Sequence, residues 1–268
     1  MAADRRRARQ EALVRALEAE ALDGLVVTSH ANIRYLTGFS GSAAVVAVTR
    51  ADVLLVTDFR YDAQARAEAG AVARVEVDGT SVWDRFFTEL ATLGSLGTLG
   101  YEAQALSVHD AGRFAQAGKA WRWMPTTELV ERLRAAKDDG EVAAIRSAAL
   151  LAGEALGQTL AQVRPGMTEL AIAGVLEGAL RRQGSEGHPF ATIVASGPRS
   201  ALPHARSSRR AVAAGEWLLL DFGAQVDGYC ADITRTVVVG ARASERQRVL
   251  YGLVRESRGA SCTSSPSP

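Results

Sequence analysis

WLLLDFGAQVDGYCADITRTVVVG, residues 217–240, consists of two runs suited to β-strands on either side of Asp227-Gly228. An Asp-Gly pair between such runs is a strong signal for a β-hairpin with a two-residue turn. If Val226 and Tyr229 close this turn, the pairing of every residue along the two strands follows. The sequence therefore predicts a hairpin with a defined register.

Two aspartates of this hairpin fall on one face. In the predicted register Asp221 lies opposite Thr234, and Asp232 lies opposite Gly223. Because Thr234 and Asp232 are two residues apart, both carboxylates project from the same side. They are diagonal neighbours, about 7–8 Å apart at the backbone. Gly223 has no side chain, so we expect open space facing Asp232.

This pair of carboxylates suits a metal site. Two carboxylates at that range can hold two divalent ions about 3.5–4 Å apart, the arrangement of two-metal hydrolysis. Asp221 also follows Leu218–Leu220, so its carboxylate enters an apolar layer where it needs a cation or hydrogen-bond donors. The alternative is that both aspartates cap turns or face solvent. A one-residue change of register would separate them onto opposite faces.

The composition is that of an ordinary globular protein. The chain has 268 residues, 47% hydrophobic and 23% charged, with a formal net charge of +1. This balance gives no argument for binding nucleic acid or a membrane surface, and no run of about 18 apolar residues predicts a membrane span. The two cysteines, Cys230 and Cys262, suggest neither a disulfide framework nor a zinc site. We therefore expect a cytoplasmic protein.

Strand-like and helical segments alternate through residues 1–136, which we expect to form one domain. The expected strands are 24–27, 43–49, 53–57, 72–77, 98–101 and 121–124, and the expected helices are 4–22, 60–68, 81–92, 108–116 and 126–136. This alternation indicates an α/β domain with a partly parallel sheet. The polar run Lys137–Gly140 marks the predicted domain boundary.

In residues 137–256 we expect helices followed, from Phe190, by short strands. A long helix should end at Pro165-Gly166, and Thr168 can cap the helix that follows. Beyond the hairpin, Ser244 can cap a final helix. The tail, residues 257–268 with the sequence SRGASCTSSPSP, has no large apolar residue, and we expect it to be disordered.

Few side chains outside the hairpin suggest chemistry. The histidines are His30, His109, His188 and His204. His204 lies in a loop before the hairpin; such a histidine is usually only solvated, but it could donate a hydrogen bond or shuttle a proton if the loop covers the aspartates. His188 precedes Pro189 and is restricted to an extended conformation, for a structural or a substrate-facing role. We assign no chemistry to the other two, and no phosphate loop or dinucleotide fingerprint is present.

Several segments together form a specific set of motifs. They are NIRYLTGF (32–39), TDFRY (57–61), KDDGEVAAIRSA (137–148), RPGMTE (164–169), ASGP (195–198) through Pro203-His204, LDFG (220–223) and DITRT (232–236). With these segments the chain resembles the creatinase, prolidase and aminopeptidase P family of pita-bread metallopeptidases, in particular its bacterial Xaa-Pro peptidase branch. The resemblance covers about residues 10–254. It implies a creatinase-like N-terminal α/β domain followed by a pita-bread domain.

The resemblance also implies a peptidase that cleaves the bond before proline in a peptide substrate. Asp221 would be the first metal ligand and Asp232 the bridging one, with two Mn²⁺ ions, or Co²⁺ or Zn²⁺, activating a hydroxide that attacks the scissile carbonyl. His204 matches the loop histidine that assists substrate binding or stabilises the tetrahedral intermediate, and His188 is a second candidate for substrate binding. Relatives often associate through the first domain, so a homodimer is also an expectation.

One departure from the family pattern concerns the remaining metal ligands. Family members supply one His and two Glu downstream of the second Asp, whereas residues 233–268 contain no histidine and only Glu245 and Glu256 as acids. We therefore expect an incomplete α+β pita-bread domain, from a truncated or frameshifted reading of a longer gene, and a purified chain without peptidase activity. Two alternatives stay open: a non-catalytic module that binds peptides or a partner, and a creatinase-like hydrolase of a small C–N substrate.

Overall fold

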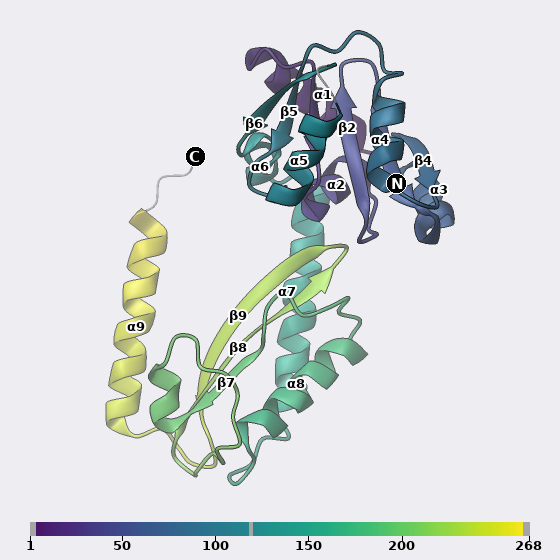
Figure 1. Ribbon diagram of the computed structural model, residues 1–268. Coiled ribbons are helices and arrows are strands. Elements are labelled where there is room, and N and C mark those ends of the chain that lie inside the picture. Colours follow the sequence, from purple (N-terminus) through teal and green to yellow (C-terminus); the bar gives the residue numbers. More distant parts are fainter. Residues whose placement is uncertain (1–3, 118–119, 265–268) are drawn as a thin grey trace. The chain divides into compact units, whose positions relative to one another are not determined.

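A six-stranded sheet organises the N-terminal unit of the described part of the chain (Figure 1). The computed structural model describes residues 4–117 and 120–264, and the chain divides after Gly140 into two compact units. The sheet has the order β4-β3-β2-β1-β5-β6. Its strands are β1 (Gly24–Val27), β2 (Ala44–Thr49), β3 (Val53–Asp58), β4 (Arg74–Asp78), β5 (Thr98–Glu102) and β6 (Arg122–Thr126). Only the pairs that involve β2 are antiparallel, so the predicted α/β domain with a partly parallel sheet is confirmed.

Helices cover both faces of this sheet. Their bounds are α1 (Arg6–Ala19), α2 (His30–Thr37), η1 (Phe59–Tyr61), α3 (Asp62–Ala69), α4 (Val82–Leu90), α5 (Val108–Gln116) and α6 (Leu129–Ala135). One core cluster joins α1, α2, α3 and α6 to Leu25, Val27 and Leu55, and another joins α4 and α5 to Val26 and Leu54. Alternate strand residues thus point to opposite faces, and both faces are apolar, as expected for strands buried between two helical layers.

Helix α2 was not expected from the sequence. It begins after the extended residue Ser29 and ends at Gly38, whose φ of +82° is the left-handed conformation that commonly terminates a helix. The signals for both ends are therefore present. The helix is only eight residues long. This is too short for its apolar residues to show a clear helical period, so the segment resembles a loop between strands.

The C-terminal unit packs two helices against one face of an antiparallel sheet (Figure 1). Its elements are α7 (Asp139–Leu160), α8 (Glu169–Arg182), β7 (Ile193–Ser196), η2 (Gly197–Ala201), β8 (Trp217–Val226), β9 (Tyr229–Val238) and α9 (Glu245–Ser264), and its sheet order is β7-β8-β9. Leu218, Leu220 and Phe222 of β8 are fully buried against these helices, where Ala152 and Ala155 of α7 let the layers approach. The intervening β8 residues, including Asp221, face the other side of the sheet.

The turn between β8 and β9 has the predicted chemistry. Asp227 and Gly228 both adopt positive φ, at +50° and +76°, as the favoured two-residue hairpin turns of this kind require. The carboxylate of Glu186 accepts hydrogen bonds from both turn amides, at 2.7 Å from Asp227 N and 3.0 Å from Gly228 N. Both local conformation and a partner from outside the hairpin therefore hold the turn.

The prediction of a disordered tail from Ser257 is wrong for residues 257–264. Helix α9 continues to Ser264, and Ser257 Oγ donates to Leu253 O at 2.9 Å, a bond that a serine can make inside a helix. Low hydrophobicity suggested disorder, but the first proline that would stop a helix is Pro266. Residues 265–268 lie outside the described part. We keep 1–136 and 137–256 as proposed domain limits.

Among the described helices, none combines the length and the hydrophobicity that crossing a membrane would require.

Candidate metal and substrate site

The two hairpin aspartates have the cross-strand partners that the sequence predicts. In the β8–β9 ladder Asp221 lies opposite Thr234, Gly223 lies opposite Asp232, and Val226 and Tyr229 close the turn. Because this register has no bulge, both carboxylates project from the face of β8 and β9 that points away from α7 and α8. Asp221 is half-buried and Asp232 is exposed.

The two carboxylates interact directly. Removal from water, the negative charge of Asp221 and a hydrogen bond with Asp221 all raise the pKa of Asp232. Asp221 in turn accepts a hydrogen bond from Thr234 Oγ1 at 2.8 Å. In the described part of the chain, neither carboxylate has an ion pair with Lys, Arg or His. Two adjacent carboxylates that are not paired with a cationic side chain fit a hard divalent cation as oxygen ligands.

The space at Gly223 itself is filled, although Asp232 is exposed and lines a cavity. A Cβ atom at Gly223 would lie 2.2 Å from Ala231 O, 2.9 Å from Pro189 Cγ and 3.3 Å from Phe190 Cε1. The segment with Pro189 and Phe190 therefore packs onto the hairpin where a side chain would otherwise be. Gly223 allows this close approach of backbone and loop, which a prediction based on the hairpin alone could not include.

A cavity of about 680 Å³ lies over the aspartate pair. Ten residues line it: Phe190, Ala191, Thr192, Ile193, His204, Ala205, Arg206, Ser207, Asp221 and Asp232. Three of the four predicted site residues thus meet at one cavity, with His204 contributed by the loop between η2 and β8. His188 is exposed and does not line it.

Sequence reasoning missed most of the other residues that line the cavity. Phe190 and Thr192 precede β7, and Arg206 and Ser207 follow His204. Ser207 Oγ accepts a hydrogen bond from Val194 N at 3.0 Å, so the His204 loop is attached to β7 beside the cavity. Their closeness in sequence to His188 and His204 is the only signal that could have found them.

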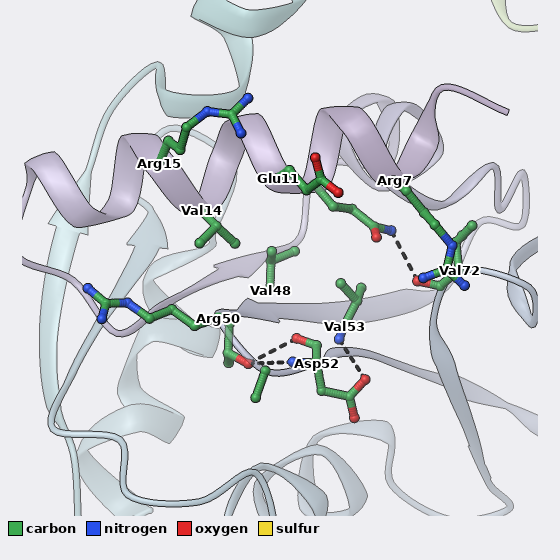
Figure 2. Close-up of a pocket in the computed structure, with 12 residues that line it drawn as sticks. Arg7, Glu11, Val14, Arg15, Val48, Arg50, Asp52, Val53 and Val72 are labelled. Atoms are coloured by element: carbon green, nitrogen blue, oxygen red, sulfur yellow. Dashed lines mark hydrogen bonds between the residues drawn. The ribbon is translucent and has the colours of Figure 1, made fainter. Parts of the chain in front are cut away.

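A second cavity, of about 390 Å³, lies in the N-terminal unit between α1 and the turn that joins β2 to β3 (Figure 2). Two of its charged side chains have partners: Arg50 pairs with Glu18 at 3.3 Å, and Arg7 donates to Ala71 O at 2.5 Å. Asp52 Oδ1 accepts from Val53 N at 2.8 Å within the turn (Figure 2). These contacts stabilise the domain, and we assign the cavity no chemistry.

Comparison with known proteins identifies both units. The model of the creatinase/prolidase N-terminal domain matches residues 9–136, and the model of metallopeptidase family M24 matches residues 143–263. The structure of an Xaa-Pro dipeptidase from Bacillus anthracis is 34% identical, with a TM-score of 0.87 over 94% of this chain and 70% of that one. The chain belongs to metallopeptidase family M24.

Other members of this family agree with the assignment. An X-Pro aminopeptidase structure from Thermotoga maritima is 33% identical, with a TM-score of 0.83, and the match covers 93% of this chain and 70% of that one. The peptidase YqhT of Bacillus subtilis is 35% identical over 88% of this chain and 66% of its own length. This chain therefore spans about two thirds of the length of these relatives. The predicted fold, a creatinase-type N-terminal domain followed by a pita-bread-type domain, is confirmed.

Membership of a metallopeptidase family implies divalent metal ions. Asp221 and Asp232 fit this implication as hard oxygen donors on one face. Within residues 4–117 and 120–264, no group of three or more His, Cys, Asp or Glu side chains could together hold a metal ion. The described residues thus offer two ligands at the hairpin.

Proposed function

We propose that this chain carries the metal and substrate site of an Xaa-Pro peptidase, which hydrolyses the peptide bond before proline. The observation that supports the proposal is the meeting of Asp221, Asp232 and His204 at one cavity, in a chain similar to proteins named Xaa-Pro dipeptidase and X-Pro aminopeptidase. A cytoplasmic homodimer remains part of the proposal.

Each residue has a proposed role. Asp221 and Asp232 would hold two divalent ions, Mn²⁺ or alternatively Co²⁺ or Zn²⁺, which when bound supply Lewis-acid activation of water and of the scissile carbonyl. His204 would donate a hydrogen bond to the carbonyl oxygen as negative charge develops there. His188, held extended before Pro189, would contact the substrate from the segment that leads to Phe190 at the cavity wall.

A second candidate, peptide binding without cleavage, is favoured by one observation. The described residues supply only the two hairpin carboxylates and no larger ligand cluster, and two carboxylates hold a divalent ion weakly and leave it open to water. For the purified 268-residue chain we keep the expectation that it does not turn over substrate.

Calorimetric titration of the chain with the dipeptide Ala-Pro, with and without Mn²⁺, tests the proposal, together with an assay for released proline. We expect Mn²⁺-dependent binding of Ala-Pro that is lost in Asp232→Asn and retained in the control Asp227→Asn, whose carboxylate lies in the hairpin turn. Release of proline would show catalysis and contradict the expected inactivity. Binding of creatine in preference to Ala-Pro would favour the creatinase-like alternative, and no Mn²⁺-dependent binding of either would overturn the proposal.

A further inference from the structure

Glu169 is a fully buried carboxylate at the start of α8. It accepts hydrogen bonds from Ser196 N and Oγ, at 2.8 and 2.9 Å, and from Ser208 N and Oγ, at 3.0 and 2.6 Å. Arg199 Nε adds an ion pair at 3.1 Å. A buried carboxylate is costly unless donors surround it, and five donor contacts meet that requirement here.

The donors come from both ends of the loop that carries His204. Ser196 ends β7 and Arg199 lies in η2, whereas Ser208 follows His204. The backbone of Glu169 also binds the chain just after this loop, since its N–H donates to Arg210 O at 3.0 Å. One side chain therefore closes the loop at its base.

A second contact supports this closure. Arg210 Nη1 donates to Ser196 Oγ at 2.7 Å, and its guanidinium pairs with Glu216 at 2.5 Å. Inside the loop, Arg199 Nη2 donates to Arg206 O at 2.5 Å. Arg199 thus links the Glu169 carboxylate to the segment that forms one wall of the cavity over the aspartates.

His204 itself is exposed, and its imidazole makes no hydrogen bond to any other described residue. Its place over Asp221 and Asp232 therefore depends on where the loop backbone runs. Four consecutive residues of this loop, His204 to Ser207, line the cavity.

We infer that Glu169 is a positioning residue of the candidate site: it fixes both ends of the 197–207 loop and thereby holds His204 at the cavity over Asp221 and Asp232. The inference rests on the proposed function for the role of His204. The closure of the loop by Glu169 does not depend on that function and can be tested without it.

The test compares wild type with Glu169→Gln, which keeps the size of the side chain but removes its charge and presents N–H groups to the serine donors. The matched control is Glu186→Gln, because Glu186 also accepts two backbone N–H bonds in this unit but holds the hairpin turn. Amide hydrogen exchange of residues 197–207 is expected to be about tenfold faster or more in Glu169→Gln, since the serine and arginine donors lose a charged acceptor. The control is expected to exchange like wild type there.

A second readout reports the position of His204 rather than loop stability alone. Mn²⁺ bound at the aspartate pair broadens nearby nuclei steeply with closeness, so the His204 imidazole signal should broaden in wild type and in Glu186→Gln. It should broaden at least about twofold less in Glu169→Gln at the same fraction of bound Mn²⁺. Ser208→Ala, which removes one donor and leaves the carboxylate in place, gives a milder variant in case Glu169→Gln does not fold.

Loop exchange equal to wild type in both Glu169→Gln and Ser208→Ala would overturn the inference, as would unchanged broadening of His204. Failure of wild type to bind Mn²⁺ would instead count against the proposed function. In that event the exchange measurement alone decides whether Glu169 holds the loop.

Discussion

Asp232 lies diagonally across the β8–β9 ladder from Asp221, with both carboxylates on one face. Loss of water, the negative charge of Asp221 and a hydrogen bond with Asp221 raise the pKa of Asp232. The folded chain thus binds this proton more tightly than the unfolded chain, and the associated stability is lost as the pH rises through the folded pKa. In chelator at pH 7, Asp232→Asn should therefore melt at a higher temperature than wild type. This difference should vanish well below the ordinary aspartate pKa of 3.8, and a lower melting temperature for the variant at pH 7 would contradict the prediction.

Bound metal should make wild type melt at a higher temperature than Asp232→Asn. An ion that binds only the folded state stabilises it by about 2.7 kcal/mol at a concentration 100-fold above its Kd. Mn²⁺ should raise the melting temperature of wild type but not of Asp221→Asn or Asp232→Asn, because each variant loses one of the two described ligands. Thermal unfolding followed across a Mn²⁺ titration measures this. The turn variant Asp227→Asn serves as control, and its shift should match that of wild type.

Gly223→Ala should destabilise the C-terminal unit. The new methyl would lie 2.2 Å from Ala231 O and 2.9 Å from Pro189 Cγ, and forcing such overpacking typically costs about 1–3 kcal/mol. Hydrogen exchange of β8 and β9 amides should accelerate accordingly. Gly174→Ala in α8 is the control: open space surrounds that position, so alanine should stabilise the helix by about 0.5–1 kcal/mol. An unchanged exchange rate in Gly223→Ala would show that the Pro189 segment does not pack on the hairpin.

Glu169 should give the C-terminal unit a pH-dependent stability. Burial alone would raise the pKa of Glu169, but the hydrogen bonds from Ser208 and Ser196 outweigh it and lower the pKa below the ordinary value of 4.5. With a depressed folded pKa, the stabilisation is present above pH 4.5 and is lost as the pH falls through the folded pKa. The free energy of unfolding of wild type should exceed that of Glu169→Gln by about 1–3 kcal/mol at pH 7. This difference should shrink toward pH 3. Urea unfolding at several pH values measures it; a constant difference would show that the charge of Glu169 is not involved.

The first turn of α9 depends on a reciprocal cap. Gln247 N donates to Ser244 Oγ at 3.2 Å, and Ser244 N donates to Gln247 Oε1 at 2.8 Å, which is a capping box. Ser244→Ala should cost about 1 kcal/mol of local helix stability, seen as faster amide exchange at the start of α9. Ser257→Ala, whose hydroxyl bonds Leu253 O within the same helix, should leave that first turn unchanged.

Local chemistry explains what the sequence could predict. The hairpin register followed from Asp227-Gly228 and from the alternation of buried residues along β8, both of which act within a few residues. Helix α5 was predicted residue for residue, and the structure adds that Ser107 caps it by accepting from Asp110 N. Thr168 caps α8 as expected, accepting from Ala171 N at 3.1 Å.

Contacts between distant segments explain what could not be predicted. No property of the hairpin indicates that Pro189 and Phe190 fill the space at Gly223. Similarly, the motif RPGMTE does not indicate that Glu169 is buried, because its donors at Ser196 and Ser208 lie far along the chain. The candidate site was therefore recognisable from its acidic and histidine side chains, whereas the parts that shape it were not.

The position of β9 at the end of the order β7-β8-β9 has a consequence for handling the protein. In the described residues β9 pairs with β8 alone, so its ten residues present a row of backbone groups to which another strand could add. Charged side chains on an edge strand oppose such self-association, and Asp232 and Arg235 are the charged residues of β9. Replacing Asp232 to abolish metal binding thus also removes a charge that opposes aggregation through this edge strand. Light scattering should accompany every measurement on Asp232→Asn, so that loss of metal binding is not confused with aggregation.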